Sequence, residues 1–476
     1  MHTAHTEKTA LRPCPVCGKN QAEILTTMRY AVLERSPLPA ASDIVCCLAC
    51  GMVYADTPGT QADYDRHYAG FAAYEQTNGI GSGTDENDAR RIEESADWLA
   101  ARIGAKNARI IDIGCAQGGL LKALSRRGFS SLAGIDPSAR CVERLKAAEI
   151  PAWQGYLGHL PAECGKGDLV VISHVLEHVV DVAGTLSALH KLLTPEGKVY
   201  IEVPDAAGYH NMAGTLPFQF IHQEHINHFD LPHLAMLCTL HGFGVSEIVR
   251  KSIGDRHDID LDGGRGGDFA LGILLIQDKQ NKLSAPSTCR EDRAGLKRHI
   301  ATYILESQRL LAAQAASSLS IEIKNRPIAL WGAGMQTQRI LATPGWKETN
   351  IVAIVDRDPN KQGKSLAGCI IEPPEKGLRH LPDNTLVIIS AHHYAEEIKS
   401  ELAMLDADLF AIILKDNPHG IPPPLKTYRY HGNPRRRIHR PPSRPPRRAP
   451  YLPHDGRRRD VPERRARPPN RAGNHL

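Results

Sequence analysis

The sequence predicts an α/β protein with two Rossmann-like domains, a small cysteine-rich lobe before them and a basic tail after them. Residues 109–136 have the pattern of a buried strand, a glycine turn, a helix and a second strand that ends in an acid. Residues 327–356 repeat that order, and two Cys-x-x-Cys-Gly pairs precede both units. Strands that alternate with helices form parallel sheets, so each unit predicts one doubly wound sheet.

The apolar patterns place the expected elements along the chain. In the first unit, strands are expected at 109–113, 132–135, 168–173 and 198–204, and helices at 88–103, 118–127, 138–149 and 182–193. In the second unit, strands are expected at 327–331, 351–356 and 386–390. Outside them, we expect a flexible aromatic arm at 61–84, a loop at 255–268 and a long helix at 291–319. Because the strands are apolar throughout, they suit sheets covered by helices on both faces.

These patterns divide the chain into five segments. They are a zinc-binding lobe at 1–60, the first Rossmann-like domain at 61–245, a connecting loop and long helix at 246–325, the second Rossmann-like domain at 326–417 and a tail at 418–476. No apolar run of about 18 residues is present, which excludes a membrane span. The N-terminus lacks an apolar segment of the secretory type, so we expect a cytoplasmic protein.

The net charge of +5 is distributed unevenly. From Lys426 to the end there are 16 Lys or Arg and 3 Asp or Glu, a net of +13, so the rest of the chain carries −8. Proline and arginine dominate the tail, which we predict to be disordered and solvated. A role in binding nucleic acid or an anionic membrane is the alternative, although the acidic body would repel phosphates.

Four of the eleven cysteines form a pattern typical of structural zinc sites. Cys14 and Cys17 form one pair, Cys47 and Cys50 form the other, and a glycine follows each pair. Four thiolates in two such turns suit tetrahedral Zn²⁺, whereas disulfides are uncommon in a cytosolic chain. Cys46 stands beside Cys47 and could compete for the same role.

The glycine turn of the first unit indicates which ligand it binds. Asp112 would face the phosphates of a dinucleotide with its own charge, which Coulomb repulsion disfavours. S-adenosylmethionine (SAM) instead carries an ammonium and a sulfonium, which suit a carboxylate at this point. Asp136 is placed to accept hydrogen bonds from the two ribose hydroxyls. The second unit has Gly332 and Gly334 but Thr337 in place of the third glycine, so we interpret it as a scaffold rather than a dinucleotide site.

Two histidine-rich segments are candidate catalytic regions. Residues 173–178, Ser-His-Val-Leu-Glu-His, follow a buried strand at the edge where such sheets bind ligands. Ser173 and His174 are expected to contact SAM, and His178 either acts in catalysis or packs against the following helix. In residues 222–228, Glu224 could orient and polarise His225 as a base.

Two alternatives apply to the second segment. His222, His225 and His228 have a spacing of three, which would place them on one face of a helix as ligands of a second metal. A purely structural role is the other alternative.

The order of these features resembles the sugar C-methyltransferases of deoxysugar biosynthesis, over about residues 12–416. Its specific pieces, besides the cysteine pairs, are the motifs at 112–114, 174–178 and 224–229 and the segment Asp356–Gly363. The resemblance implies a class I methyltransferase Rossmann-like domain and a zinc-ribbon-like lobe. It also implies a nucleotide-linked keto-deoxysugar substrate that is methylated on the carbon next to its ketone.

The resemblance further implies roles for individual residues. By this comparison zinc is held by Cys14, Cys17, Cys47 and Cys50, SAM is surrounded by Asp112, Gly114, Gly118 and Asp136, and the sugar faces His178, Glu224 and His225. His225 is then the expected base, and Tyr74 corresponds to a tyrosine that lines the family's site. His222 stands where the family usually has tyrosine.

The sequence therefore predicts an enzyme, a SAM-dependent C-methyltransferase that forms an enolate. Methyl transfer to oxygen or nitrogen of a sugar or small molecule is the first alternative, since it needs SAM but no enolate. A zinc and arginine module that binds nucleic acid is the second, and it leaves both glycine turns unexplained.

Overall fold

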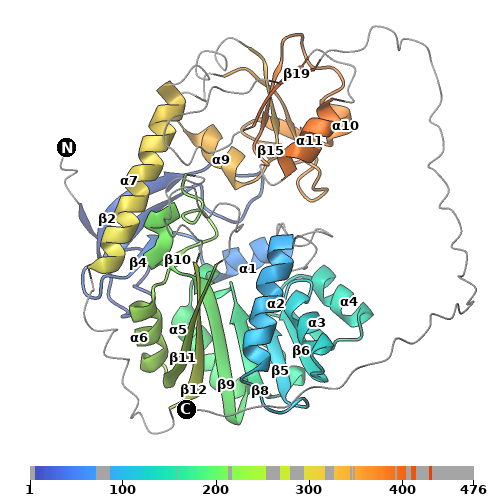
Figure 1. Cartoon of the computed structure of the whole chain (residues 1–476). Coiled ribbons are helices and arrows are strands. Elements are labelled where there is room, and N and C mark those ends of the chain that lie inside the picture. Colours follow the sequence, from blue (N-terminus) through green and yellow to red (C-terminus); the bar gives the residue numbers. More distant parts are fainter. Residues whose placement is uncertain are drawn as a thin grey trace, which may run out of the picture. The chain divides into compact units, whose positions relative to one another are not determined.

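The computed structural model describes residues 6–70, 86–156, 158–212, 217–252, 269–278, 294–316, 326–343, 346, 349–391, 394–403, 409–413 and 428–430. Three sheets run through this part of the chain (Figure 1). The first belongs to the cysteine-rich lobe, the second to the first Rossmann-like unit and the third to the C-terminal unit. No helix in the described ranges has the length and apolar character needed to cross a membrane.

The N-terminal sheet is antiparallel, with the order β1-β2-β3-β4-β10. Its strands are β1 (Glu7–Thr9), β2 (Gln21–Arg29), β3 (Ala41–Cys47), β4 (Val53–Asp56) and β10 (Asn227–His228). The strand β10 comes from the histidine-rich segment far along the chain, and His228 lies opposite Val53 in β4. The second candidate catalytic segment is therefore anchored to the N-terminal lobe.

Helix α1 (Gln61–Gly70) occupies the first part of the segment expected to be a flexible arm. Tyr64 is buried in it, and its hydroxyl donates to the backbone oxygen of Gln223 at 3.1 Å. That contact orders the segment, so the prediction of an arm is wrong for residues 61–70. Residues 71–85, with the candidate Tyr74, lie outside the described residues.

The central sheet has the order β11-β12-β9-β8-β5-β6-β7. Its strands are β5 (Arg109–Ile113), β6 (Ser131–Asp136), β7 (Ala152–Gln154), β8 (Gly167–Ser173), β9 (Leu193–Pro204), β11 (Phe243–Ser252) and β12 (Phe269–Gln277). The strands from β7 to β9 are parallel, while β12 is antiparallel to both of its neighbours. The predicted strands of the first unit are confirmed, each to within a few residues.

Helices cover both faces of this sheet, as the apolar strands predicted. Alternate residues of β5 and β8 enter two different cores: Ile110, Leu169 and Val171 on one face, and Ile111, Val170 and Ile172 on the other. The helices are α2 (Glu86–Ala100), α3 (Gly119–Arg126), α4 (Ala139–Ala147), α5 (Val182–Leu192) and α6 (Leu231–Leu240). Residues of α2, α3 and α4 join the first core, and those of α5 and α6 join the second.

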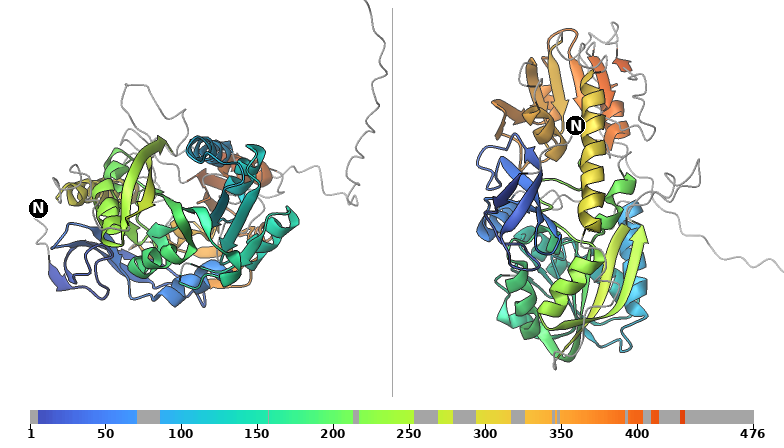
Figure 2. Two further views of the ribbon diagram at one scale, coloured as in Figure 1. Left: turned by 90° about the horizontal axis from the view of Figure 1, so that it is seen from below. Right: turned by 90° about the vertical axis from the view of Figure 1, so that its left-hand side faces the viewer.

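The segment 246–325 differs from the expected connection. Strand β11 extends into it, and β12 inserts between β9 and β11 as the antiparallel strand of the central sheet; the three lie side by side in Figure 1 and again in Figure 2. The run Phe269–Gln277 is nearly continuous in apolar residues because both of its faces are covered. The expected long helix is confirmed as α7 (Gly295–Ala316). The expected loop at 255–268 lies outside the described residues.

The C-terminal sheet has the order β15-β16-β14-β13-β17-β18-β19. Its strands are β13 (Ile328–Trp331), β14 (Ile351–Val355), β15 (Ser365–Leu366), β16 (Cys369–Glu372), β17 (Leu386–Ile389), β18 (Leu409–Ile413) and β19 (Tyr428–Tyr430). Its helices are α9 (Met335–Ala342), α10 (Pro374–Gly377) and α11 (Ala395–Leu402). The three predicted strands are present. Strand β19 pairs with β18 inside the segment assigned to the tail, so the tail boundary at 418 is set too early.

The turn before α3 allows a test of the packing of the glycine turn. Gly118 has φ +74°, and a Cβ there would lie 2.3 Å from Leu145 Cδ2, whereas Gly165, with φ +70°, has open space around it. Both Gly→Ala changes incur about 1–2 kcal/mol of left-handed strain. Gly118→Ala adds an overpacking cost of about 1–3 kcal/mol. Urea unfolding should therefore rank Gly118→Ala below Gly165→Ala, and equal losses would contradict the close packing.

Candidate active site

The glycine turn is held by the acid that ends the neighbouring strand. Asp136 Oδ2 accepts a hydrogen bond from the backbone N–H of Ala116 at 2.8 Å, and Oδ1 accepts one from Ser138 at 2.9 Å. Ala116 has φ +46°, a left-handed conformation uncommon for residues other than glycine. At Gly114, φ is +72° and a Cβ would lie 2.4 Å from Val175. Asp136 therefore shapes the turn in which Gly114 and Gly118 lie.

Asp112 and Asp136 place two acidic side chains together at the edge of the sheet. Both side chains are buried, at the carboxyl ends of adjacent parallel strands. Burial, and then the proximity of Asp136, raise the pKa of Asp112 to about 8. Ionising Asp112 is costly, because burial and the neighbouring acid outweigh the favourable effect of Arg91. A cationic ligand such as SAM would remove this cost, so the two acids fit the group that the sequence predicted for them.

His174 begins the loop after β8 in a strained conformation, with φ +54°. Its ring lies between two buried carboxylates, with Nδ1 3.4 Å from Glu177 Oε1 and Nε2 3.2 Å from Glu202 Oε1. Burial alone would lower the pKa of His174, but its contacts with the carboxylates of Glu177 and Glu202 raise it. Lys251 Nζ, 2.6 Å from Glu202 Oε2, completes a buried network of charges. The contact of Ser173 and His174 with SAM stays a prediction.

His178 lies at the centre of a second cluster. Its Nδ1 is 2.8 Å from the hydroxyl of Tyr68 in α1 and 2.9 Å from the backbone oxygen of Glu224. The ring centroid of His225 is 4.8 Å from that of His178, and those of His222 and His225 are 4.0 Å apart. The structure therefore brings together the predicted residues His178, His222 and His225, and adds Tyr68.

The carboxylate of Glu224 is turned toward a residue that the sequence did not single out. Its Oε1 lies 3.3 Å from His67 Nε2 in α1. Burial would raise the pKa of Glu224, but the hydrogen bond to His67 lowers it to about 2. Glu224 is therefore ionised and pairs with α1, so the direct polarisation of His225 that the sequence predicted is not the contact seen here.

Two imidazoles of the second cluster, those of His222 and His225, are neutral at physiological pH. Burial and the neighbouring ring of His178 lower the pKa of His222 to about 4. Burial, followed by His222 and His178, holds the pKa of His225 well below its ordinary value. A neutral imidazole has a free lone pair, so His225 has the protonation state required of a base.

The alternative of a metal held by His222, His225 and His228 depends on a helix, and residues 222–226 form none. His228 is a strand residue, fully buried, with burial lowering its pKa to about 3. Its ring contacts Tyr209, with centroids 5.9 Å apart. The spacing of three therefore does not place these rings on one face, and this prediction is wrong in its geometry.

The four predicted cysteines gather in the N-terminal lobe, with their sulfurs within 4.8 Å of one another. Cys14 Sγ lies 3.6 Å from Cys50 Sγ, and Cys17 Sγ lies 3.5 Å from Cys47 Sγ. A tetrahedron with Zn–S bonds of about 2.3 Å has sulfur–sulfur edges of about 3.8 Å, so the donor set fits zinc. The Cys46 thiol instead faces the backbone oxygen of Gly51 at 3.6 Å.

Arg12, next to the first cysteine pair, connects the lobe to both histidine-rich loops. Its side chain is buried and donates to the backbone oxygens of Ala55 at 2.9 Å, Ile226 at 2.9 Å and Val180 at 3.4 Å. It also donates to Asn227 Oδ1 at 2.7 Å. Sequence analysis missed Arg12 as a site residue, because a single arginine in a loop has no periodicity or spacing that indicates a role.

In the C-terminal unit, the acid Asp356 is engaged by the protein itself. Its Oδ2 accepts a hydrogen bond from the backbone N–H of Ala333 at 2.7 Å and lies 3.2 Å from Lys361 Nζ.

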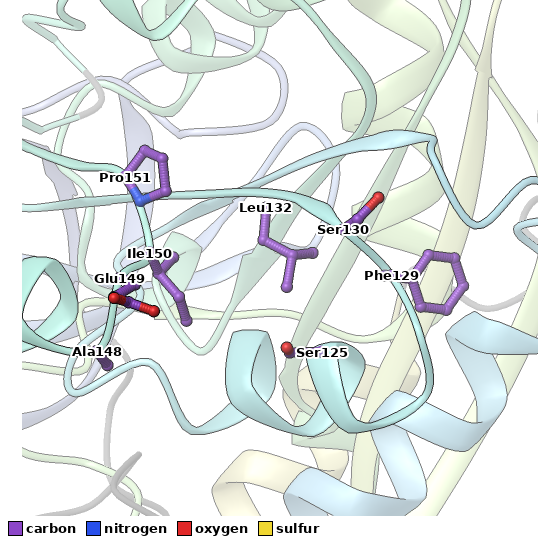
Figure 3. A pocket seen from close by; sticks show the side chains of 8 residues that line it. All are labelled: Ser125, Phe129, Ser130, Leu132, Ala148, Glu149, Ile150 and Pro151. Carbon is purple, nitrogen blue, oxygen red and sulfur yellow. The ribbon is translucent and has the colours of Figure 1, made fainter.

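A separate surface pocket, shown in Figure 3, lies at the amino end of β6 in the central sheet. It is lined by Ser125, Phe129, Ser130, Leu132, Ala148, Glu149, Ile150 and Pro151. This is the edge opposite Asp112 and Asp136, so that pocket is distinct from the candidate active site.

Comparisons with known proteins relate two parts of the chain to known families. Residues 85–248 match the family model described as a methyltransferase domain, and residues 324–413 match the model described as C2185-like, N-terminal. The chain is 26% identical to C-methyltransferase NovU of Streptomyces niveus, over 65% of this chain and 72% of that protein. It is 34% identical to a ubiquinone biosynthesis O-methyltransferase of Psychrobacter cryohalolentis, over 27% of this chain and 53% of that protein. The chain thus spans about half the length of that second relative.

Solved structures with partial similarity include a SAM-dependent methyltransferase from Mesorhizobium loti, with 19% identity and a TM-score of 0.32 over 39% of this chain and all of that one. Another is the magnesium protoporphyrin IX methyltransferase from Synechocystis, with 17% identity and a TM-score of 0.32 over 45% of this chain and 94% of that one. By its methyltransferase domain and relatives, the chain is a SAM-dependent methyltransferase. The predicted class I Rossmann-like methyltransferase fold is confirmed.

The raised pKa of Asp112 predicts that this residue destabilises the ligand-free protein while it favours the binding of SAM. Its folded-state pKa of about 8 exceeds the ordinary 3.8, so the folded state holds the extra proton and stability falls as pH rises from about 4 to 8. Asp112→Asn should therefore raise the melting temperature of the ligand-free protein at pH 8, by about 2–4 °C for each kcal/mol recovered.

The same change should weaken SAM binding in calorimetry. Near pH 7, wild type should release close to one proton on binding, measured in buffers of different ionisation enthalpy, and Asp112→Asn should release none. A variant that melts lower and binds SAM unchanged would contradict the assignment of Asp112.

Proposed function

We propose that this SAM-dependent methyltransferase methylates the carbon next to the ketone of a nucleotide-linked keto-deoxysugar. The observation that carries the proposal is the neutral His225 beside the His178–Tyr68 pair. This arrangement supplies a base together with hydrogen-bond donors, the two requirements of enolate formation. Similarity to a protein named as a C-methyltransferase and the motifs shared with the sugar C-methyltransferases support it.

SAM, held by Asp112, Gly114, Gly118, Asp136 and the end of β8, supplies a methyl group on a positively charged sulfur. All other steps depend on this chain's residues. The base His225 takes the proton from the carbon next to the ketone, and the C–H electron pair moves into the enolate. The donors His178 and Tyr68 stabilise the negative charge that develops on the ketone oxygen. Most of the rate gain then comes from orientation and from exclusion of water.

Methyl transfer to oxygen is the second candidate. The similarity to ubiquinone biosynthesis O-methyltransferases over 140 residues favours it. It requires a base for a hydroxyl but no enolate, so exchange of a carbon-bound hydrogen separates the two reactions.

We also propose structural zinc on Cys14, Cys17, Cys47 and Cys50, and a division of the chain into the five segments predicted from the sequence. The tail boundary then moves beyond β19, and the methyltransferase domain takes in β11 and β12. The C-terminal sheet would serve as the second Rossmann-like domain, and its position in the chain suits a role in holding the nucleotide part of the substrate.

The base assignment predicts exchange without methyl donor. Wild type should exchange the hydrogen next to the ketone in D₂O, with a panel of nucleotide-linked keto-deoxysugars and no SAM, read by mass. His225→Ala should lower both exchange and methyl transfer by about 10²–10⁴-fold while SAM still binds. His159→Ala, on an exposed histidine, is the control and should match wild type. Methyl transfer without exchange by wild type would favour the oxygen acceptor.

The zinc proposal predicts one zinc per chain by elemental analysis. Cys14→Ser should lose the metal and unfold at lower denaturant, because the metal stabilises the folded lobe. Cys46→Ser alters an adjacent buried thiol outside the cluster and should keep the metal. Retention of zinc by Cys14→Ser, or its loss from Cys46→Ser, would refute this ligand set.

A further inference from the structure

Glu177 is a buried acid that the reaction above leaves without a role. Glu177 is 1% exposed, and neither of its carboxylate oxygens makes a hydrogen bond of good geometry with the described residues. Such a group is costly unless charges nearby compensate for its burial. Here the compensation consists of imidazoles. His174 Nδ1 lies 3.4 Å from Oε1 and His178 Nε2 lies 3.8 Å from it.

The base of the proposed reaction faces the same carboxylate. A carboxylate oxygen of Glu177 and one ring nitrogen each from His178 and His225 all lie within 4.8 Å of one another. Over such distances an ionised carboxylate stabilises an imidazolium appreciably. By contrast, the carboxylate of Glu224 is paired with His67.

Backbone contacts fix this arrangement. The N–H of Ile226 donates to the oxygen of Glu177 at 2.8 Å, so the residue after the base is tied to the residue that carries the acid. The amide of Asn227 donates to the oxygens of Leu176 at 3.0 Å and Val179 at 2.7 Å. On the other side His174, held by Glu202, restrains the Glu177 carboxylate.

We propose that Glu177 is a positioning residue that provides the counter-charge for the imidazolium formed on His225 when it takes the substrate's proton, with His174 holding the carboxylate in place. The proton moves from the substrate carbon to His225, and Glu177 stays ionised throughout. The effect on catalysis rests on the proposed function, whereas the interaction of the Glu177 charge with the histidines does not.

Several titratable groups face Glu177 and enter any pH dependence. His174 and His178 come from its own loop, His222 and His225 from the following histidine-rich loop, and Tyr209 from the 3₁₀ turn Ala206–Met212. The measurement must therefore resolve each histidine separately. NMR of protein labelled with ¹³C in its histidine rings, assigned with single His→Gln variants, does so without substrate.

The test compares Glu177→Gln, which keeps the side-chain volume but removes the charge, with Glu163→Gln on an exposed acid. Glu177→Gln should lower the pKa of His174 and of His225, since their charged forms lose a nearby anion. Glu163→Gln should leave both unchanged. Glu177→Asp keeps the charge at a shorter reach and should give values nearer wild type, even if Glu177→Gln proves unstable.

The kinetic readout is the α-hydrogen exchange described above. Glu177→Gln should lower its kcat by about 10²-fold with KM little changed, and Glu177→Asp should recover part of the loss. Identical histidine titrations in wild type, Glu177→Gln and Glu177→Asp would overturn the counter-charge role and leave the proposed function standing. Absence of exchange in wild type would instead overturn the proposed function, while the titration result would stand.

Metal content distinguishes the counter-charge role from a metal site, because two histidines and a carboxylate at these distances could also hold a metal ion. Elemental analysis should give the same metal content for Glu177→Gln as for wild type. Loss of one equivalent of metal from Glu177→Gln would overturn the proposal in favour of a metal site.

Discussion

The arrangement of the active site depends on one buried guanidinium, that of Arg12. Its donors bind backbone oxygens of β4, of the loop before α5 and of the loop that carries His225. Three chain segments far apart in sequence thus meet on one rigid, planar group. Burial lowers the pKa of Arg12 to about 10, so the charge persists at physiological pH, stabilised by oriented carbonyl dipoles. Through this residue the cysteine lobe is hydrogen-bonded to the loops that carry the candidate histidines.

The charged groups around β8 and β9 show how a strained loop is maintained. His174 adopts a left-handed conformation that costs of order 1 kcal/mol or more for a residue with a side chain. The ring is nevertheless fixed between Glu177 and Glu202, and Glu202 in turn accepts from Lys251 and from the hydroxyl of Tyr200 at 2.5 Å. Removing one member would leave others buried and unpaired, so the network resists relaxation of the loop. This rigidity keeps Glu177 in place without direct hydrogen bonds.

The sequence predicted what depends on local pattern. Strand 109–113, its glycine turn and the acid at 136 follow from apolar runs and from the backbone needs of Gly114 and Gly118, and the cysteine spacing alone indicated the four-sulfur cluster. The sequence missed β12, since an apolar run of nine residues does not reveal which sheet it joins or in which direction. The direction of the Glu224 side chain was also missed, because adjacency in sequence favoured His225 while the fold placed His67 closer. Arg12 and Tyr68 make contacts across more than a hundred residues, and Glu177 meets His225 across 48, separations that no periodicity encodes.

The two halves of the candidate site have opposite electrostatic requirements. The half expected to bind SAM must favour a cation, whereas the half with the histidines must keep them uncharged. At the ends of β5 and β6, Asp112 and Asp136 create a site that favours a cation. Near the end of β8, which pairs with β5, burial keeps His222 and His225 uncharged. A protonated imidazole there would repel a sulfonium and would have no lone pair to accept a proton. In the proposed reaction, burial of the histidines serves both needs, because a neutral base can stand beside a cationic methyl donor. The charge that the proposed reaction places on His225 then requires an anion that is already in place, since a desolvated site has little water to reorganise around it.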